Sequence, residues 1–122
     1  MRLRPWLQLR PDEQAFFCEQ ARPLLEAEPV RRMEDFVQHG ETSCLHHCLG
    51  VAYFSFVICR RLNLRCDQRA LIRGALLHDF FLYDWHRHDP ARPKHGFFHP
   101  RAALANAERY FPVGVCEREI IL

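Results

Sequence analysis

Apolar residues recur at helical spacing along most of this chain of 122 residues. A first helix is predicted to begin at Pro11, which two acidic residues follow, and its apolar positions continue until Pro29 interrupts them. The pattern predicts a second, short helix over residues 30–37, ended by Gly40. Apolar and polar residues alternate convincingly in no segment, so the pattern predicts an all-α fold.

The longest apolar segment predicts a central helix. Ser43 can cap this helix, which runs to about Leu62 with apolar residues nearly all round, as is typical of a buried helix. Asp67 can cap the next predicted helix, whose apolar positions lead to the doublet His78-Asp79. The doublet therefore lies at the end of a helix that packs inward.

The last third of the chain predicts a long loop and two more helices. Two prolines and Gly96 favour a loop over residues 83–98, and loops of this length inside compact domains are often functional. Pro100 fits the first position of a helix, with His99 as its cap. A final helix begins near Cys116, which gives a bundle of about five to six helices.

The composition is that of one soluble globular domain, spanning residues 1–122. The net charge of +2 is small and the basic residues are scattered among acids, which disfavours nucleic acid as a partner. No segment has the ~20 apolar residues of a membrane span or the core of a secretory signal, so we expect a cytoplasmic protein with no membrane partner. The cysteines are then thiols, and Cys44 and Cys48 fit small buried residues better than a zinc site.

The doublet His78-Asp79 offers two metal ligands. Consecutive side chains diverge by about 100° on a helix, but both can bind one ion that lies just beyond the last turn. Nitrogen and oxygen ligands of this kind suit Mn, Fe, Mg, Zn or Co. His47 on the central helix is a third candidate, with a core histidine bonded to a backbone carbonyl as the alternative interpretation. His46 competes with it, although it points about 100° away.

Further histidines follow the doublet. His95 and His99 flank Gly96 and are additional candidates for a metal or substrate site. His86 and His88 lie among charged residues, so a solvated or substrate-facing position fits them better.

Taken together, these motifs resemble a bacterial branch of the HD-domain superfamily of metal-dependent phosphohydrolases. The resemblance covers roughly residues 36–122, and residues 1–35 contribute helices without a motif. The matching segments are Gln38-His39-Gly40, Leu45-His46-His47-Cys48, Arg73-Gly74-Ala75-Leu76-Leu77-His78-Asp79-Phe80-Phe81-Leu82-Tyr83-Asp84-Trp85 and His95-Gly96-Phe97-Phe98-His99-Pro100-Arg101-Ala102-Ala103-Leu104.

The resemblance implies a divalent metal ion that activates a water for attack on a phosphate ester or nucleotide, a phosphorylated small molecule being the partner. It assigns His47, His78 and Asp79 as metal ligands, with His78 and Asp79 at the catalytic centre. His99 would bind a second metal ion or a phosphate. The candidate substrate contacts are His95, Asp84, Lys94 and Arg101, while surface solvation is the favoured interpretation for Arg92.

The chain departs from the family at its C-terminus. The family's closing Asp lies on a later helix, whereas here the last predicted helix is short and marginal by itself. We therefore expect a bundle that is incomplete at the C-terminus, with a homodimer as one way to cover the central helix. The alternative function is a truncated, non-catalytic module that binds metal, nucleotide or a protein partner, and a third is a plain helical interaction protein.

Overall fold

The computed structural model describes residues 4–35, 37–39, 42–80 and 95–122, with the side chains of 37–39, 42 and 95–99 left out of the description. Six α-helices dominate the described residues, which confirms the predicted all-α fold. Their bounds are α1 Pro11–Leu25, α2 Glu28–Arg31, α3 Cys44–Arg61, α4 Gln68–Leu77, α5 His95–Tyr110 and α6 Val115–Ile121. Two 3-10 helices, η1 Pro5–Leu7 and η2 Arg32–Asp35, and two short strands, β1 Val37–His39 and β2 Thr42–Ser43, complete the described elements.

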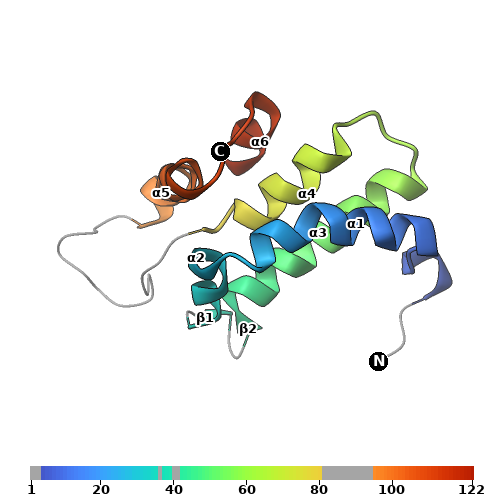
Figure 1. The fold of residues 1–122 in the computed structure, drawn as a ribbon, viewed down its shortest axis with the longest axis horizontal. Helices are drawn as coiled ribbons and strands as arrows, with labels where there is room; N and C mark the ends of the chain where they lie inside the picture. The colour runs from blue at the N-terminus through green and yellow to red at the C-terminus, as the bar shows by residue number, and fades with distance from the viewer. Residues whose placement is uncertain (1–3, 36, 40–41, 81–94) are drawn as a thin grey trace.

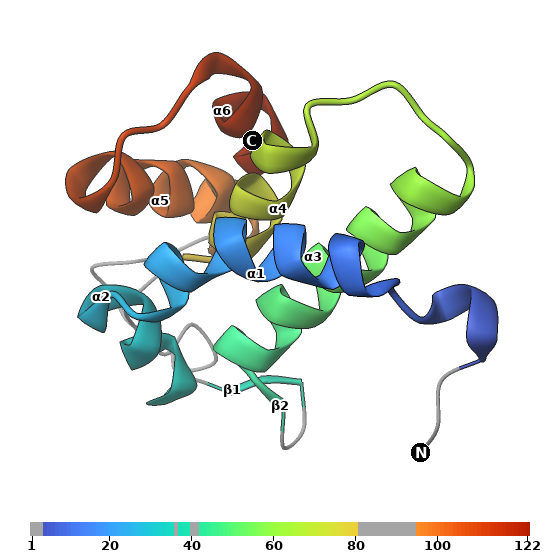
Figure 2. The same cartoon turned by 45° about the vertical axis from the view of Figure 1, so that its right-hand side comes forward.

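Helix α4 is the middle layer of the molecule. Figures 1 and 2 show α4 between α3 on one side and α6 on the other, with α1 lying across α3 and α4. Two predicted caps are confirmed: the Ser43 hydroxyl accepts from the His46 amide at 3.1 Å, and the Asp67 carboxylate accepts from the Ala70 amide at 3.0 Å. These caps fix the starts of the two helices that carry the candidate ligands.

Three predictions about element bounds are wrong. The helix predicted over residues 30–37 is replaced by α2, η2 and β1, because Pro29 takes a first-turn position in α2 instead of breaking a helix. Strands β1 and β2 pair antiparallel, and with three and two residues they are too short for alternation to reveal them. Residues 95–98 belong to α5 and not to a loop; the rest of the predicted loop, residues 83–94, lies outside the described part of the chain.

Pro100 is not at the first position of its helix, and His99 is not a cap. Helix α5 begins at His95, so Pro100 falls in its second turn. Only the first four amides of a helix lack partners within it, so a proline at the sixth position removes one intrahelical hydrogen bond. The loss is confined to the N-terminal part of α5.

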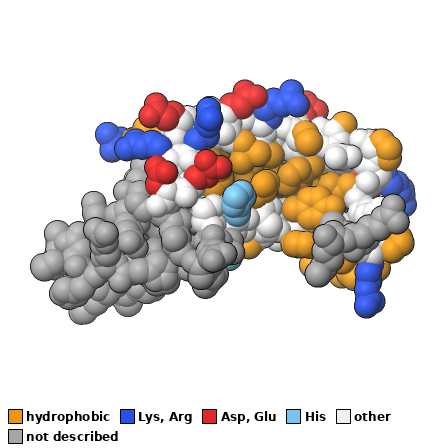
Figure 3. All heavy atoms as spheres, turned by 90° about the horizontal axis from the view of Figure 1, so that it is seen from below, with side chains coloured by type: hydrophobic (Ala, Val, Ile, Leu, Met, Phe, Trp, Pro, Cys, Tyr) orange, Lys and Arg blue, Asp and Glu red, His pale blue; other side chains and the backbone are white. Residues whose placement is uncertain are grey.

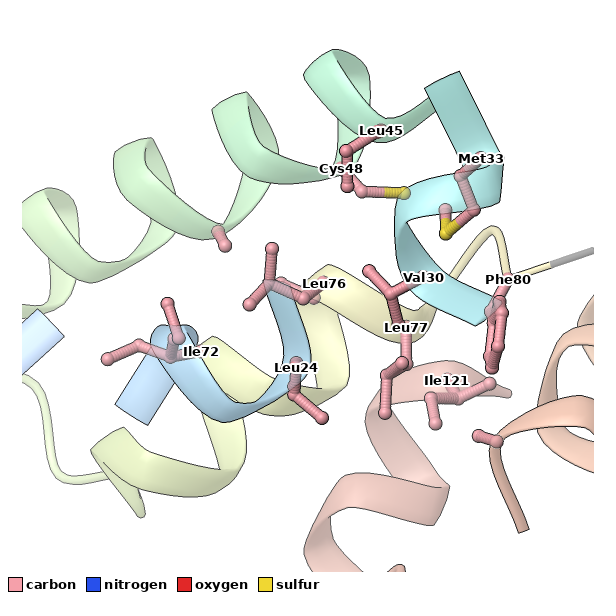
Figure 4. Close-up of a cluster of buried hydrophobic side chains, with 14 of the residues drawn as sticks. Leu24, Val30, Met33, Leu45, Cys48, Ile72, Leu76, Leu77, Phe80 and Ile121 are labelled. Carbon is pink, nitrogen blue, oxygen red and sulfur yellow. The ribbon is translucent and has the colours of Figure 1, made fainter. Parts of the chain in front are cut away.

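The core lies where α1, α2, α3 and α4 meet. Figure 4 shows Leu24, Val30, Leu45, Cys48, Ile72 and Leu76 directed toward one another from these helices, with Phe80 and Ile121 closing the cluster at the α6 end. Phe80 is fully buried and comes directly after the His78-Asp79 doublet. Burial of Phe80 therefore anchors the chain just past the doublet. None of the described helices combines the length and apolar composition that crossing a bilayer requires.

Helix α6 is held closely against α4. A Cβ atom built on Gly74 would lie 2.7 Å from Ile120 Cγ2, so only glycine permits this approach. Beside it, Arg73 Nε donates to Glu117 Oε2 at 3.1 Å, and both side chains are buried. Arg73 also donates to the Pro112 carbonyl at 3.0 Å. Packing and a buried ion pair thus stabilise a seven-residue helix that would be marginal alone.

A buried carboxylate joins the start of α1 to the end of α3. Glu13 accepts from the Arg10 amide at 2.8 Å, from Arg60 at 3.0 Å and from Arg61 at 2.9 Å. The hydrogen bond from Arg61 is the main reason that the pKa of Glu13 is lowered from 4.5 to about 2, although burial opposes it. The charged form of Glu13 is therefore stabilised by folding.

We expect the free energy of unfolding to fall as pH is lowered from about 5 to about 2. Because the folded pKa of Glu13 lies below the unfolded value, its contribution is complete above the unfolded pKa and is lost as pH falls through the folded one. The loss is at most about 3 kcal/mol, since Arg60 is more than one-third exposed and solvent screens its charge. Urea unfolding at several pH values measures it. Glu13→Gln should flatten the profile in this window, and an unchanged slope would contradict the assignment.

Candidate metal centre

Three candidate ligands come together from two helices. His47 lies in the first turns of α3, and His78 is the C-cap of α4, followed at once by Asp79. The carboxylate oxygen Asp79 Oδ2 lies 3.3 Å from His47 Nε2 and 3.3 Å from His78 Nε2. One ligand atom from each residue lies within 4.8 Å of the others. The divergence of 100° on a regular helix does not separate His78 from Asp79, because the helix ends between them.

The centre is partly open to solvent. Asp79 is 3% exposed, whereas the side chains of His47 and His78 are each about one-quarter exposed. The two imidazole rings lie 5.4 Å apart between centroids. A carboxylate held in a site with little water exerts a stronger field on a nearby cation than an exposed one does. The arrangement places that carboxylate at the base and the two rings toward the surface.

The proton on His78 is placed by a backbone carbonyl. His78 Nδ1 lies 2.5 Å from the Ala75 oxygen, which can only accept, so Nδ1 carries a proton. In a neutral ring Nε2 then presents a lone pair, and it faces Asp79 Oδ2, which is also an acceptor. A ring with a lone pair on Nε2 is also the form of imidazole that can bind a metal ion.

Two side chains that sequence analysis did not assign to the site hold the backbone of Asp79 in place. The Cys44 thiol donates to the Asp79 carbonyl at 3.2 Å, and Asn106 Nδ2 of α5 donates to the Phe80 carbonyl at 2.8 Å. The pKa of the neighbouring Cys48 thiol is raised well above its usual value, mainly by a hydrogen bond with Cys44 and by burial. Both thiols are fully buried, which agrees with the prediction of small core residues.

The donor set fits a divalent metal ion. Two ligand atoms that each lie ~2.1 Å from an ion, at angles of ~90–110°, are separated by ~3.0–3.4 Å. Both nitrogen-to-oxygen separations of 3.3 Å fall in this range, and the ligand nitrogens of the two histidines lie within 4.8 Å of each other. The ring nitrogen of a metal-binding histidine that does not bind the ion usually donates to a carbonyl or carboxylate, which orients the ring, and His78 Nδ1 makes such a contact with the Ala75 carbonyl.

The remaining predicted residues are not brought into this cluster by the described part of the chain. Arg101 is exposed on α5, and none of the contacts described for it reaches the centre. His95 and His99 lie on α5, but their side chains are outside the description, as are Asp84 and Lys94 entirely. His46 is exposed and does not join His47 in the cluster. Of these two adjacent histidines, His47 is the one that the cluster includes.

Comparison with known proteins gives one finding and two negative results. The sequence profile of the HD domain matches residues 44–109, which include His47, His78 and Asp79. No curated protein and no solved structure gives a significant match. HD domains typically bind divalent metal ions, and the His47, His78 and Asp79 cluster could hold one. Since the matched residues make up more than half of this chain, the chain belongs to the HD-domain family, a superfamily of metal-dependent phosphohydrolases.

Proposed function

We propose that this protein is a metal-dependent phosphohydrolase that cleaves a phosphate ester or a nucleotide with a metal-activated water. The observation that most directly supports this is that His47, His78 and Asp79 each offer a ligand atom within 4.8 Å of the others. A divalent cation could bind one atom from each of the three residues. In this proposal His47, His78 and Asp79 are the protein ligands of one ion.

A divalent ion bound there lowers the pKa of a water and offsets the charge on the phosphoryl oxygens. The chain's own residues prepare that position. The Ala75 carbonyl fixes the tautomer of His78, so that its Nε2 lone pair points toward Asp79. Cys44 and Asn106 fix the backbone on either side of the Asp79–Phe80 peptide, which limits movement of the carboxylate. Three protein ligands leave positions for water and substrate.

The proposal also extends to residues predicted from the family resemblance. His99 is proposed as a ligand of a second ion or a phosphate contact, and His95, Asp84, Lys94 and Arg101 as substrate contacts. Arg101 is the member of this set whose side chain is described, and its exposure on α5 leaves the guanidinium available to an anion. Mn, Fe, Mg, Zn and Co all suit the nitrogen and oxygen donors.

We expect a divalent metal ion to raise the melting temperature by about 10 °C when it is present at ~100 times its dissociation constant. Binding to the folded state alone contributes about 2.7 kcal/mol at that excess, and each kcal/mol raises the melting temperature by a few degrees at this chain length. Thermal unfolding with Mn²⁺, then with a chelator, measures the shift and its reversal. His47→Ala should remove the shift, whereas His46→Ala, one residue away, should keep it.

Hydrolysis itself is tested with a panel of phosphomonoesters, a generic phosphodiester and nucleotides in the presence of Mn²⁺. Turnover that requires the ion and is lost in His78→Ala supports the proposed function. A metal-induced melting shift without turnover on any member would favour the non-catalytic module. Identical melting with and without each of the candidate ions would refute metal binding at this centre.

A further inference from the structure

Helix α3 carries a notch on its exposed side, next to the candidate metal centre. His46, Gly50 and Phe54 follow one another at intervals of four residues, so they form one row along the helix. A Cβ atom built on Gly50 meets nothing within 4 Å, in contrast to Gly74, which is in tight contact with α6. The space above Gly50 is therefore open, with a ring side chain on each side of it.

Two grooves meet at this notch. One has a volume of about 480 Å³ and extends over Val51, Ser55 and Ile58, with His47 of the metal centre in its lining. The other has a volume of about 450 Å³ and reaches toward α1, where Phe17 and Cys18 line it. His46, Gly50 and Phe54 line both grooves. His47 belongs both to the lining of the first groove and to the candidate metal centre, so this groove borders the centre.

The lining of the grooves indicates what kind of group they accept. In the described part of the chain, no Lys, Arg, Asp or Glu side chain lines either groove. Phe54 and Ile58 are 42% and 43% exposed and lie one helical turn apart, so together they form a continuous apolar surface. Figure 3 shows hydrophobic side chains gathered in a patch on the side where α3 lies in Figure 1, with a histidine among them. Such a surface favours an uncharged, apolar group over a polyanionic chain.

The spacing of the row leaves room for a planar group. His46 and Phe54 are eight residues apart, which corresponds to ~12 Å along a helix axis. At ~3.5 Å per stacking contact, a flat ring can stack on one of these two side chains, and the rest of the notch has room for its substituents. The open Gly50 lets this ring approach the helix backbone.

We infer that the notch over Gly50 binds the aromatic portion of a phosphate ester whose phosphate lies at the His47, His78 and Asp79 centre. This inference rests on the proposed function and adds a substrate class to it: esters of aromatic alcohols, or nucleotides whose base occupies the notch. Continuity of the groove with His47 is the reason to assign it to the substrate instead of to a second copy of the chain.

Binding of an aromatic group in the notch can be tested with two non-hydrolysable probes, methylphosphonate and (1-naphthylmethyl)phosphonate. Each probe is titrated into the Mn²⁺-loaded protein and its affinity is measured by calorimetry. We expect the naphthyl probe to bind at least tenfold more tightly than the methyl probe. Gly50→Leu should fill the notch and reduce naphthyl binding at least tenfold, with methylphosphonate binding changed less than twofold. Naphthalene fluorescence reports the same binding without any catalytic turnover. Leucine is well accepted in helices and meets open space here, so the variant should fold.

Ala105→Leu is the matched control, because Ala105 is exposed on α5 and lines neither groove. It should leave the binding of both probes unchanged. Equal affinities for the two probes, or equal loss of both in Gly50→Leu, overturns the inference while leaving the metal site intact. Failure of methylphosphonate itself to bind refutes the proposed function and the inference with it. A dimer in sedimentation that Gly50→Leu converts to a monomer also overturns it, since a second copy then occupies the notch.

Discussion

Asp79→Asn is expected to weaken binding of a divalent metal ion by at least ~100-fold and to reduce metal-dependent hydrolysis to background. Loss of an outer-shell partner alone costs 10–100-fold in metal affinity, and Asp79 supplies the oxygen that lies 3.3 Å from both histidine nitrogens. Asparagine keeps the shape and removes the negative charge. Calorimetric titration with Mn²⁺ and initial rates on the best substrate of the panel measure the two effects.

The fold should survive this substitution. The Cys44 thiol and Asn106 bind backbone carbonyls of residues 79 and 80, and these contacts do not involve the carboxylate. Asp12→Asn is a matched control, because Asp12 is an exposed acid in the first turn of α1. It should bind metal and turn over substrate as the parent does. Full activity in Asp79→Asn would exclude this residue from the centre.

Gly74→Ala and Gly50→Ala are expected to change stability in opposite directions. At Gly74 the new methyl group would lie 2.7 Å and 2.8 Å from two atoms of Ile120, so α6 must move away from α4. Overpacking of this kind costs about 2 kcal/mol. At Gly50 the methyl group meets open space, and replacing a helical glycine by alanine stabilises by about 0.5–1 kcal/mol.

Urea unfolding midpoints of the two variants measure this contrast directly. Both variants replace a helical glycine by alanine, so intrinsic helix propensity changes the free energy of unfolding equally in the two. The difference in free energy between the variants therefore reports on the contact between α4 and α6. If Gly74→Ala were as stable as Gly50→Ala, the close packing of Ile120 on α4 would be refuted. The ion pair between Arg73 and Glu117 lies at the same contact, so its solvent exposure should rise in Gly74→Ala.

Helices α1, α3 and α4 could be predicted from the sequence because each has its own local signals. Pro11 begins α1, and the side chains of Ser43 and Asp67 cap the other two. The short elements between α1 and α3 were missed, since α2, η2 and the paired strands are too brief for periodicity. The start of α5 was misplaced because Pro100 was given the position that proline most often takes, while the helix begins five residues earlier.

The ligand set could be predicted in part. Histidine and aspartate are side chains that can bind metal ions, and the HD-type pattern connects His47 to the doublet. The residues that support the doublet could not be found in this way. Cys44 lies 35 residues before Asp79 and Asn106 lies 26 residues after Phe80, so only tertiary packing brings them together. The close approach at Gly74 likewise depends on a helix more than 40 residues further along the chain.

The distribution of thiols makes the metal centre observable by chemical labelling. Cys18, Cys66 and Cys116 are exposed, whereas Cys44, Cys48 and Cys59 are buried. A raised pKa makes Cys48 still less reactive in the native state, because the thiolate is the nucleophile. Alkylation of Cys44 breaks the hydrogen bond from its thiol to the Asp79 carbonyl, so it requires the contact between α3 and the doublet to open. The rate at which Cys44 becomes labelled therefore measures how often this contact opens.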